Sequence, residues 1–168
     1  MGGRPVRQTS FAEFQCSIAR TMEAVGDWWS PLILRDVFVG VNRFDDLATD
    51  LGISRNLLTR RLDHLVEAGV LDRVPYQDRP VRHEYVLTES GRELVPLLVG
   101  LMAWGDRWQT PDGGPPAIVG HHGHPVRPQV TCADCGEPIV ATELTVTGGP
   151  GGRIAPGTTI IGALLADG

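Results

Sequence analysis

Four polar residues in the middle of the chain have side chains that could read the edges of DNA bases: Arg55, Asn56, Thr59 and Arg60. Arginine can bridge guanine through two hydrogen bonds, asparagine suits adenine, and a threonine methyl group can touch the methyl group of thymine. Readout of this kind requires the side chains to share one exposed surface. Residues three and four apart are neighbours on a helix, so the spacing predicts that a helix presents them.

Arginines further along the chain could contact DNA phosphates or enter the minor groove, which sets register more than sequence. Arg79 lies in a Pro-containing loop at 77–81, and Arg82 directly follows that loop. The flanking segments, 71–76 and 82–88, alternate in polarity and contain β-forming residues, which predicts a β-hairpin. Arg73 on the first of these strands is a further candidate for a phosphate contact.

The helix that would carry the base-reading residues has clear start and stop signals. Ser54 is a typical N-cap residue, and Gly69 marks the end. A shorter helix is expected over 44–51, and Gly52 ends it because glycine takes a positive φ without penalty. Two short helices joined by a tight turn and followed by a hairpin predict a winged helix-turn-helix. The apolar stripe expected on the buried side of the second helix consists of Leu58, Leu62, Leu65 and Val66.

Three further helices are expected around this unit. The first spans 9–25. Ser30 and Pro31 start the second, which runs to Phe38 and is apolar nearly all round, so we expect it at the centre of the domain. The third follows a capping-type start at 88–91 and runs to 108, with Pro96 near its beginning, where a missing amide hydrogen costs little.

The third helix has a wider apolar surface than a helix lying on a small domain needs. Excess apolar area of this kind usually binds a partner. The first helix and the 90–108 helix are therefore the candidate interface of a homodimer, and a long helix buried within its own monomer is the alternative. The apolar residues of the third helix are Leu94, Leu97, Leu98, Leu101, Met102 and Trp104.

The composition of the chain changes after residue 109. Residues 111–168 hold 12 of the 21 glycines and 8 of the 13 prolines, and helical periodicity disappears. We expect a disordered lead at 1–8, a winged-helix DNA-binding and dimerisation domain over 9–110, a linker over 111–120 and a small β extension over 121–168. Within the extension, short strands are expected at 129–132 and 139–147. The last dozen residues could add a strand or pack back onto the dimer.

Cys132 and Cys135 form a Cys-x-x-Cys turn, the shape of one zinc knuckle. A structural zinc requires four ligands, and His122 and His124 are candidates for the other two. The alternative is a small β core that holds no metal. No cofactor is required for the fold that the rest of the sequence predicts.

The net charge is −5, which at first sight argues against a nucleic-acid partner. The charge is unevenly distributed, however: residues 53–82 contain six arginines and four acidic residues. Phosphate contact is a local property and does not require a basic protein. No run of about 18 apolar residues is present, and the amino terminus has no signal segment. Together with an odd number of cysteines, these features predict a cytoplasmic protein without a membrane span.

Residues 16–108 resemble the HxlR family of winged-helix bacterial transcription regulators, in the MarR-like superfamily. The likeness is carried by 16–20, 26–29, 32–36, 43–47, 52–54, 58–62, 65–69 and 85–88. Ser17 and Asp27 stand where the family usually has Pro and Lys. The resemblance implies a mainly α fold with a β-hairpin wing, to which this chain adds a β-rich, Gly/Pro-rich extension. It also implies homodimers that bind inverted-repeat operators.

Some members of this family sense electrophiles or oxidants through a cysteine at the position of Cys16. A reactive thiol must be accessible and ionised, and Arg20, one turn along the expected helix, could lower its pKa. A buried structural cysteine is the competing interpretation.

These observations predict a sequence-specific DNA-binding regulator, a homodimeric repressor on an inverted-repeat operator, with a possible small-molecule or oxidant effector. The alternative is a ligand-, redox- or metal-responsive protein-interaction module whose winged helix no longer binds DNA. The cluster of Arg55, Arg60 and Arg61 favours the first. No nucleophile motif or phosphate-binding loop is present, so we do not expect an enzyme.

Overall fold

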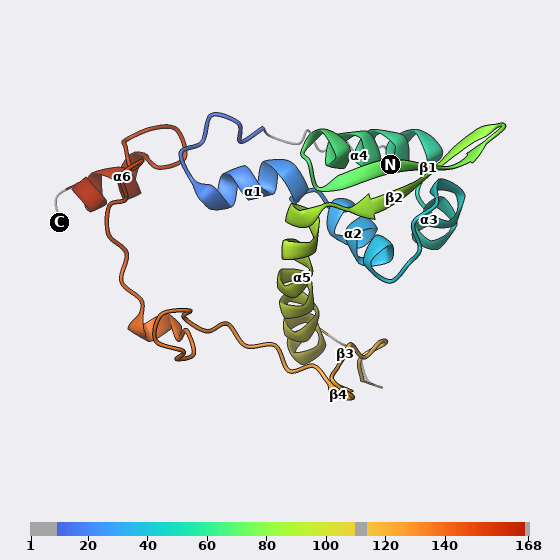
Figure 1. The fold of residues 1–168 in the computed structure, drawn as a ribbon. Coiled ribbons are helices and arrows are strands. Elements are labelled where there is room, and N and C mark those ends of the chain that lie inside the picture. The colour runs from blue at the N-terminus through green and yellow to red at the C-terminus, as the bar shows by residue number, and fades with distance from the viewer. Residues whose placement is uncertain (1–9, 110–113, 167–168) are drawn as a thin grey trace, which may run out of the picture.

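The computed structural model describes residues 10–109 and 114–166 of the 168-residue chain. Figure 1 shows a helical domain with a protruding hairpin, and an extension that leaves the end of the longest helix. The elements are α1 Ser17–Val25, α2 Ser30–Phe38, α3 Phe44–Leu51, α4 Arg55–Glu67, β1 Leu71–Asp78, β2 Val81–Leu87, α5 Glu89–Trp108, β3 Gly120–His121, β4 His124–Pro125, a 3-10 turn Ala141–Glu143, and α6 Thr159–Ala166. The expected lead at 1–8 and part of the expected linker lie outside the described residues.

The predicted helix-turn-helix is confirmed as α3 and α4. Gly52 adopts a left-handed φ of 60°, which ends α3 and turns the chain. The Ser54 hydroxyl then accepts a hydrogen bond from the Leu57 amide at 3.4 Å, which caps α4. The stripe on the inner side of α4 is buried at Leu58, Leu62 and Leu65, and these side chains join the core.

The predicted wing is an antiparallel pair of β1 and β2. Strand β1 runs two residues further than the sequence indicated and β2 begins one residue earlier, so the loop shrinks to a turn at residues 79 and 80. The register runs from Leu71 opposite Leu87 to Asp78 opposite Val81, with an irregularity between Pro75 and Gln77. The residues before α3 pair with the wing as well, because Asn42 accepts a hydrogen bond from the Tyr85 amide at 2.8 Å.

Helix α2 lies at the centre of the core, as its apolar sequence predicts. Ile33 and Leu34 are fully buried. The cap of α2 comes from upstream: the Asp27 carboxylate accepts hydrogen bonds from the amides of Trp29 and Ser30, and from the Ser30 hydroxyl. These bonds satisfy amide groups that a helix start would otherwise leave unpaired.

One predicted helix boundary and the predicted place of one proline are wrong. The helix expected over 9–25 begins only at Ser17, because residues 11–14 form a turn in which the rings of Phe11 and Phe14 meet edge to face. Pro96 lies well inside α5 and not near its start, since the Thr88 hydroxyl caps the helix at Glu89 by accepting a bond from the Gly91 amide.

The extension has little regular β structure. Strands β3 and β4 pair over two residues each. The expected strands at 129–132 and 139–147 do not form: Thr131 makes an isolated bridge with Pro138, and the Ile139 amide donates to the Val130 carbonyl at 2.9 Å. The final segment forms helix α6, so the strand considered for it is wrong. Residues 121–166 are therefore mostly irregular, and the extension contacts the domain at α5 and near Phe14.

Within the described part of the chain, no helix is both long and apolar enough to cross a lipid bilayer.

Candidate nucleic-acid interface

The structure presents the four predicted base-reading residues together on the outer side of α4. Arg55, Asn56, Thr59 and Arg60 are all exposed and occupy the first two turns of the helix. The Thr59 hydroxyl donates to the Arg55 carbonyl at 3.0 Å. That bond occupies the hydroxyl of Thr59, which leaves its methyl group for an apolar contact.

Arg55 already has two contacts on α3. Its guanidinium forms an ion pair with Asp45, with Nη1 and Oδ1 separated by 2.6 Å, and it lies 4.7 Å from the centre of the Phe44 ring. Both charged side chains remain 69% exposed, so solvent screens the pair and its energy is small. The pair orients Arg55, and its carboxylate competes with any phosphate or base that the arginine would bind.

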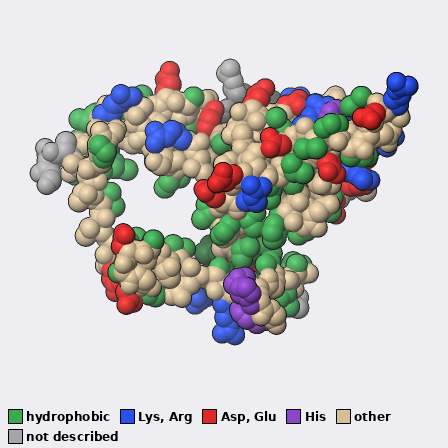
Figure 2. Space-filling view, in the orientation of Figure 1, with side chains coloured by type: hydrophobic (Ala, Val, Ile, Leu, Met, Phe, Trp, Pro, Cys, Tyr) green, Lys and Arg blue, Asp and Glu red, His purple; other side chains and the backbone are tan. Residues whose placement is uncertain are grey.

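The arginines of the wing are exposed to solvent. Arg73, Arg79 and Arg82 are all exposed, and Figure 2 shows cationic side chains at the wing tip. The Gln77 side chain donates to the Arg79 carbonyl at 3.1 Å, which stabilises the turn. In Figure 1 the hairpin projects beyond α3 and α4, in the manner of a wing that reaches past a reading helix.

Sequence reasoning missed the role of Arg43. Its guanidinium lies over the Tyr76 ring at 4.3 Å, and its backbone bridges to Glu84, so it adds a cation at the base of the wing. Only the pairing of the segment before α3 with β2 creates this position, and no sequence signal indicates that pairing.

Arg61 does not belong to the exposed arginine cluster. It turns inward from α4, and its Nε lies 3.2 Å from Oδ1 of Asp27, whose side chain is 5% exposed. A buried carboxylate requires a partner of opposite charge, so Arg61 secures α4 against the start of α2. The predicted cluster of three arginines therefore consists of two exposed cations and one structural cation.

Comparison with known families agrees with this geometry. Residues 24–112, which contain the helix-turn-helix, the wing and α5, match the family described as HxlR-like helix-turn-helix. The chain belongs to the HxlR family. As the relatives below also indicate, it is a transcription regulator of the helix-turn-helix type and not an enzyme.

HxlR relatives cover the domain and much of the extension. A protein of Mycobacterium tuberculosis strain H37Rv, named as an HTH-type transcriptional regulator, is 49% identical over 80% of this chain and 87% of its own. The crystal structure of the transcription factor PA1607 has a TM-score of 0.73 and 37% identity, and covers 83% of this chain and 99% of its own. The redox regulator HypR in its oxidised form has a TM-score of 0.53 and 28% identity, over 57% of this chain and all of its own.

Cys16, the cysteine that the sequence offers as a candidate redox sensor, directly precedes α1 and is half-buried. Arg20, which was predicted to act on this thiol, donates from its Nη2 to the Ser17 hydroxyl at 3.1 Å. Cys16 therefore lies at the start of α1 without being fully buried.

The extension does not bring the four predicted zinc ligands together. Cys132 and Cys135 share one turn, in which backbone hydrogen bonds from Cys135 and Asp134 lower the pKa of the Cys132 thiol. His122 and His124 flank Gly123 in the β3–β4 hairpin, and both their rings lie near that of His121. No group of three or more His, Cys, Asp or Glu side chains that could hold a metal ion occurs among the described residues. The donor set therefore does not fit a tetrahedral Cys2His2 zinc in this arrangement.

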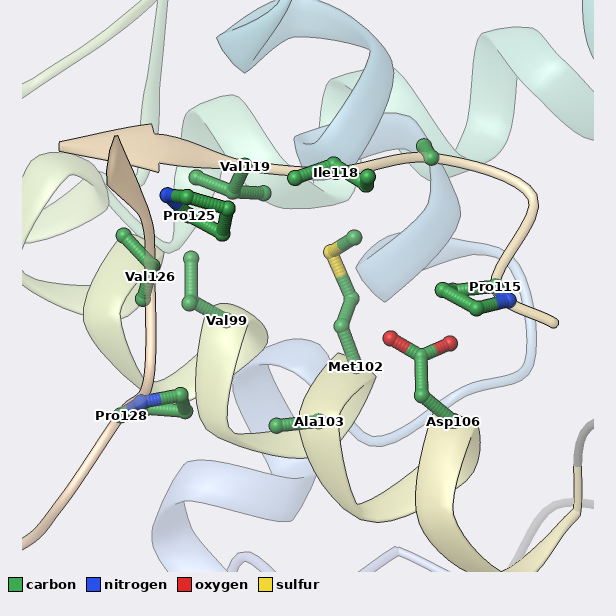
Figure 3. Close-up of a pocket in the computed structure, with 11 residues that line it drawn as sticks. Val99, Met102, Ala103, Asp106, Pro115, Ile118, Val119, Pro125, Val126 and Pro128 are labelled. Atoms are coloured by element: carbon green, nitrogen blue, oxygen red, sulfur yellow. The ribbon is translucent and has the colours of Figure 1, made fainter. Parts of the chain in front are cut away.

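A cavity of about 230 Å³ separates α5 from the first part of the extension. In Figure 3, Val99, Met102 and Asp106 project from α5 toward the strand-like segment that contains Ile118 and Val119. The lining side chains are apolar except that of Asp106. Residues 115–128 thus cover one face of α5 and leave the opposite face free. The remaining lining residues are Ala103, Pro115, Ala117, Pro125, Val126 and Pro128.

Proposed function

We propose that this HxlR-family chain is a homodimeric repressor that binds an inverted-repeat operator in double-stranded DNA. The observation that carries the proposal is the exposed polar surface at the start of α4, adjacent to a wing whose arginines also point outward, on a chain with net charge −5. Clustered cations at this place would not strengthen binding to a protein partner, whereas they would strengthen binding to a polyanion such as DNA.

The proposed contacts divide by role. Arg55, Asn56 and Arg60 bind base edges in the major groove, and the Thr59 methyl group touches thymine. Arg79 and Arg82 in the wing hold phosphates or enter the minor groove, and they fix the register.

The free face of α5 supports a dimer. Leu97, Leu101, Trp104 and Trp108 recur at steps of four, three and four residues, and each is between 57% and 63% exposed. This spacing gives one continuous stripe, which lies on the side of α5 opposite the cavity-lining residues. Exposed apolar residues of α1, Ile18 and Met22, enlarge the surface. A second copy packed on this surface would remove the α5 stripe and the two α1 residues from water.

Two-fold pairing would place the α4 helices of the two copies in successive major grooves, which is the geometry that an inverted repeat requires. Repression is the expected output because a dimer seated over a promoter excludes polymerase by occupancy alone.

The test is a mobility-shift titration on an operator selected from a random DNA library by the parent protein. We expect Arg60→Ala to weaken binding by about 5- to 150-fold, the range for the loss of one base contact. Arg153→Ala removes the same charge from the extension and serves as the matched control. Equal affinities of the two folded variants would exclude α4 as the reading helix.

A redox response is a second candidate, supported by the structural likeness to the redox regulator HypR and by the half-buried thiol of Cys16. In this proposal hydrogen peroxide oxidises the Cys16 thiol to a sulfenic acid and is itself reduced to water, and the oxidised protein releases the operator. Treatment with hydrogen peroxide should then lower DNA affinity in the parent and in the Cys132→Ser/Cys135→Ser variant, but not in Cys16→Ser. Loss of the response in the Cys132→Ser/Cys135→Ser variant alone would assign sensing to the extension.

A further inference from the structure

The second part of the extension stands away from the domain. Residues 129–165, which we call the arm, leave the far end of α5 and return beside α1, so that the arm, α1 and α5 border an opening (Figure 1). At its return the arm touches the domain closely: Gly157 lies so near the Phe14 ring that an added Cβ would collide with it. Figure 2 shows that the opening passes through the molecule and that hydrophobic side chains occur along its border.

The arm is apolar without having a core of its own. None of its residues is buried, and large apolar side chains are exposed along its whole length. Each such side chain gains about 1.5–3 kcal/mol when it is fully removed from water, so a segment of this composition has a strong tendency to find a covering surface. The exposed residues are Val130, Ile139, Val140, Leu144, Val146, Ile154, Ile160, Ile161 and Leu164.

The chemistry of the arm excludes DNA as its partner. Its charged residues are Asp134, Glu137 and Glu143 against Arg153, which gives a negative balance that phosphates would repel. The wing projects from the side of the domain away from the arm in Figure 1. The partner must instead offer an apolar surface.

Such a surface exists on α5 of the same protein, in the Leu97–Trp108 stripe. The first part of the extension covers the opposite side of α5 and leaves this stripe exposed. A single helical stripe is small compared with the roughly 1,200–2,000 Å² that a stable interface buries. Contributions from two arms would enlarge it, and two-fold symmetry supplies both at once.

We propose that the arm clasps a second copy of this chain, so that residues 129–165 of one subunit pack on α5 and α1 of the other and fill the opening. This inference rests on the proposed homodimer and specifies how its subunits hold each other. The extension is then an assembly element of the regulator.

Cross-linking between differently tagged chains tests the arrangement. In a background of Cys16→Ser, Cys132→Ser and Cys135→Ser, one chain carries Leu101→Cys on α5 and the other carries Val146→Cys on the arm. The two chains are co-expressed, purified through both tags and treated with a bis-maleimide. We expect a covalent heterodimer of the two chains. Val81→Cys, an exposed apolar position in the wing, replaces Val146→Cys in the control and should give none.

The outcomes separate this inference from the proposed dimer. A chain that carries both Leu101→Cys and Val146→Cys but links only within itself would show that the arm folds onto its own subunit and would overturn the proposal. Absence of any link would do the same. Sedimentation of the cysteine-free background reports the dimer independently: a monomer there rejects the homodimer, whereas a dimer without inter-chain links rejects the clasp alone.

Discussion

In the structure, the guanidinium of Arg55 is already paired with a carboxylate. Asp45 bonds it at 2.6 Å from the neighbouring helix, and the Phe44 ring lies against its guanidinium. The pair lowers the entropy that Arg55 would lose on binding, and it also places a negative charge beside the expected phosphates. These two effects on DNA affinity oppose each other. Neither can exceed the interaction free energy of an exposed ion pair, which is about 0.2–1 kcal/mol.

Asp45→Asn should raise operator affinity by about two- to fivefold, because removal of the carboxylate frees the guanidinium and reduces repulsion of the phosphates. Fluorescence anisotropy with a labelled operator at two salt concentrations measures the change. Asp46→Asn alters the same net charge one residue away, without touching the ion pair, and is the control. If both variants gain equally, long-range charge explains the effect and the Asp45–Arg55 pair does not restrain binding.

Asp27 and Arg61 show a different use of charge. Asp27 accepts three hydrogen bonds at the start of α2 and an ion pair from Arg61 on α4. Asp27→Ala should lower the free energy of unfolding by about 3 kcal/mol, since it leaves Arg61 without its carboxylate in a half-buried place. Urea unfolding measures it. Asp63→Ala, on the exposed side of α4, should change little, and equal losses in the two variants would contradict a structural role for the pair.

At the scale of elements, Glu23 attaches the segment before α1 to the helix. Its carboxylate accepts bonds from the Phe11 amide at 2.5 Å and the Ser10 hydroxyl at 2.9 Å, and these bonds lower the pKa of Glu23. A lowered pKa in the folded protein means that the attachment contributes stability above the ordinary glutamate pKa. The contribution is lost as pH falls through the folded value.

Amide exchange of Phe11 should therefore accelerate when the solution is acidified through that range, after correction for the intrinsic rate. In Glu23→Gln the amide should exchange fast at every pH, because the charged acceptor is absent. A pH-independent protection of Phe11 in the parent would show that Glu23 does not hold the segment.

The elements that sequence predicts well are those with local signals. Gly52 and Ser54 define the turn and the cap of the helix-turn-helix, and alternation defines the wing, so α3, α4 and the hairpin follow from neighbouring residues alone. The exposure of the four candidate base-reading residues of α4 follows from the same periodicity. The inward turn of Arg61 and the stacking of Arg43 depend on distant segments, and neighbouring residues do not encode them.

The extension was the hardest part to predict for the same reason. Its β-forming segments have strand propensity, but a strand forms only where a partner strand lies beside it, and Thr131 meets Pro138 at one bridge only. The last segment has no competing partner strand and forms α6. The four expected zinc ligands stay apart because the Cys turn and the β3–β4 hairpin are separate local structures.

At the scale of the whole molecule, the candidate DNA-binding arginines and the exposed apolar stripe lie on different elements. The wing and α4 present exposed arginines, while α5 and the arm present exposed leucines, isoleucines, valines and tryptophans. A dimer built on that apolar surface would leave both copies of α4 uncovered. In the proposed dimer, assembly and DNA binding would therefore use different faces.

Trp104→Ser should weaken the dimer at least tenfold, because it removes a large apolar side chain from the middle of the α5 stripe. Val81→Ser, an equally exposed apolar position in the wing, should leave association unchanged. Analytical ultracentrifugation over a range of concentrations gives both dissociation constants. Undiminished association of the tryptophan variant would remove α5 from the interface.

The opening beside the arm also affects how fast the subunits of the proposed dimer would separate. A subunit held through an encircling segment can depart only after that segment lifts away, so separation is governed by a slow conformational step and not by the strength of the contacts alone. Regulators interlocked in this way would keep their original pairs for long periods, even when growth dilutes the protein. Newly made chains would then pair mainly with one another.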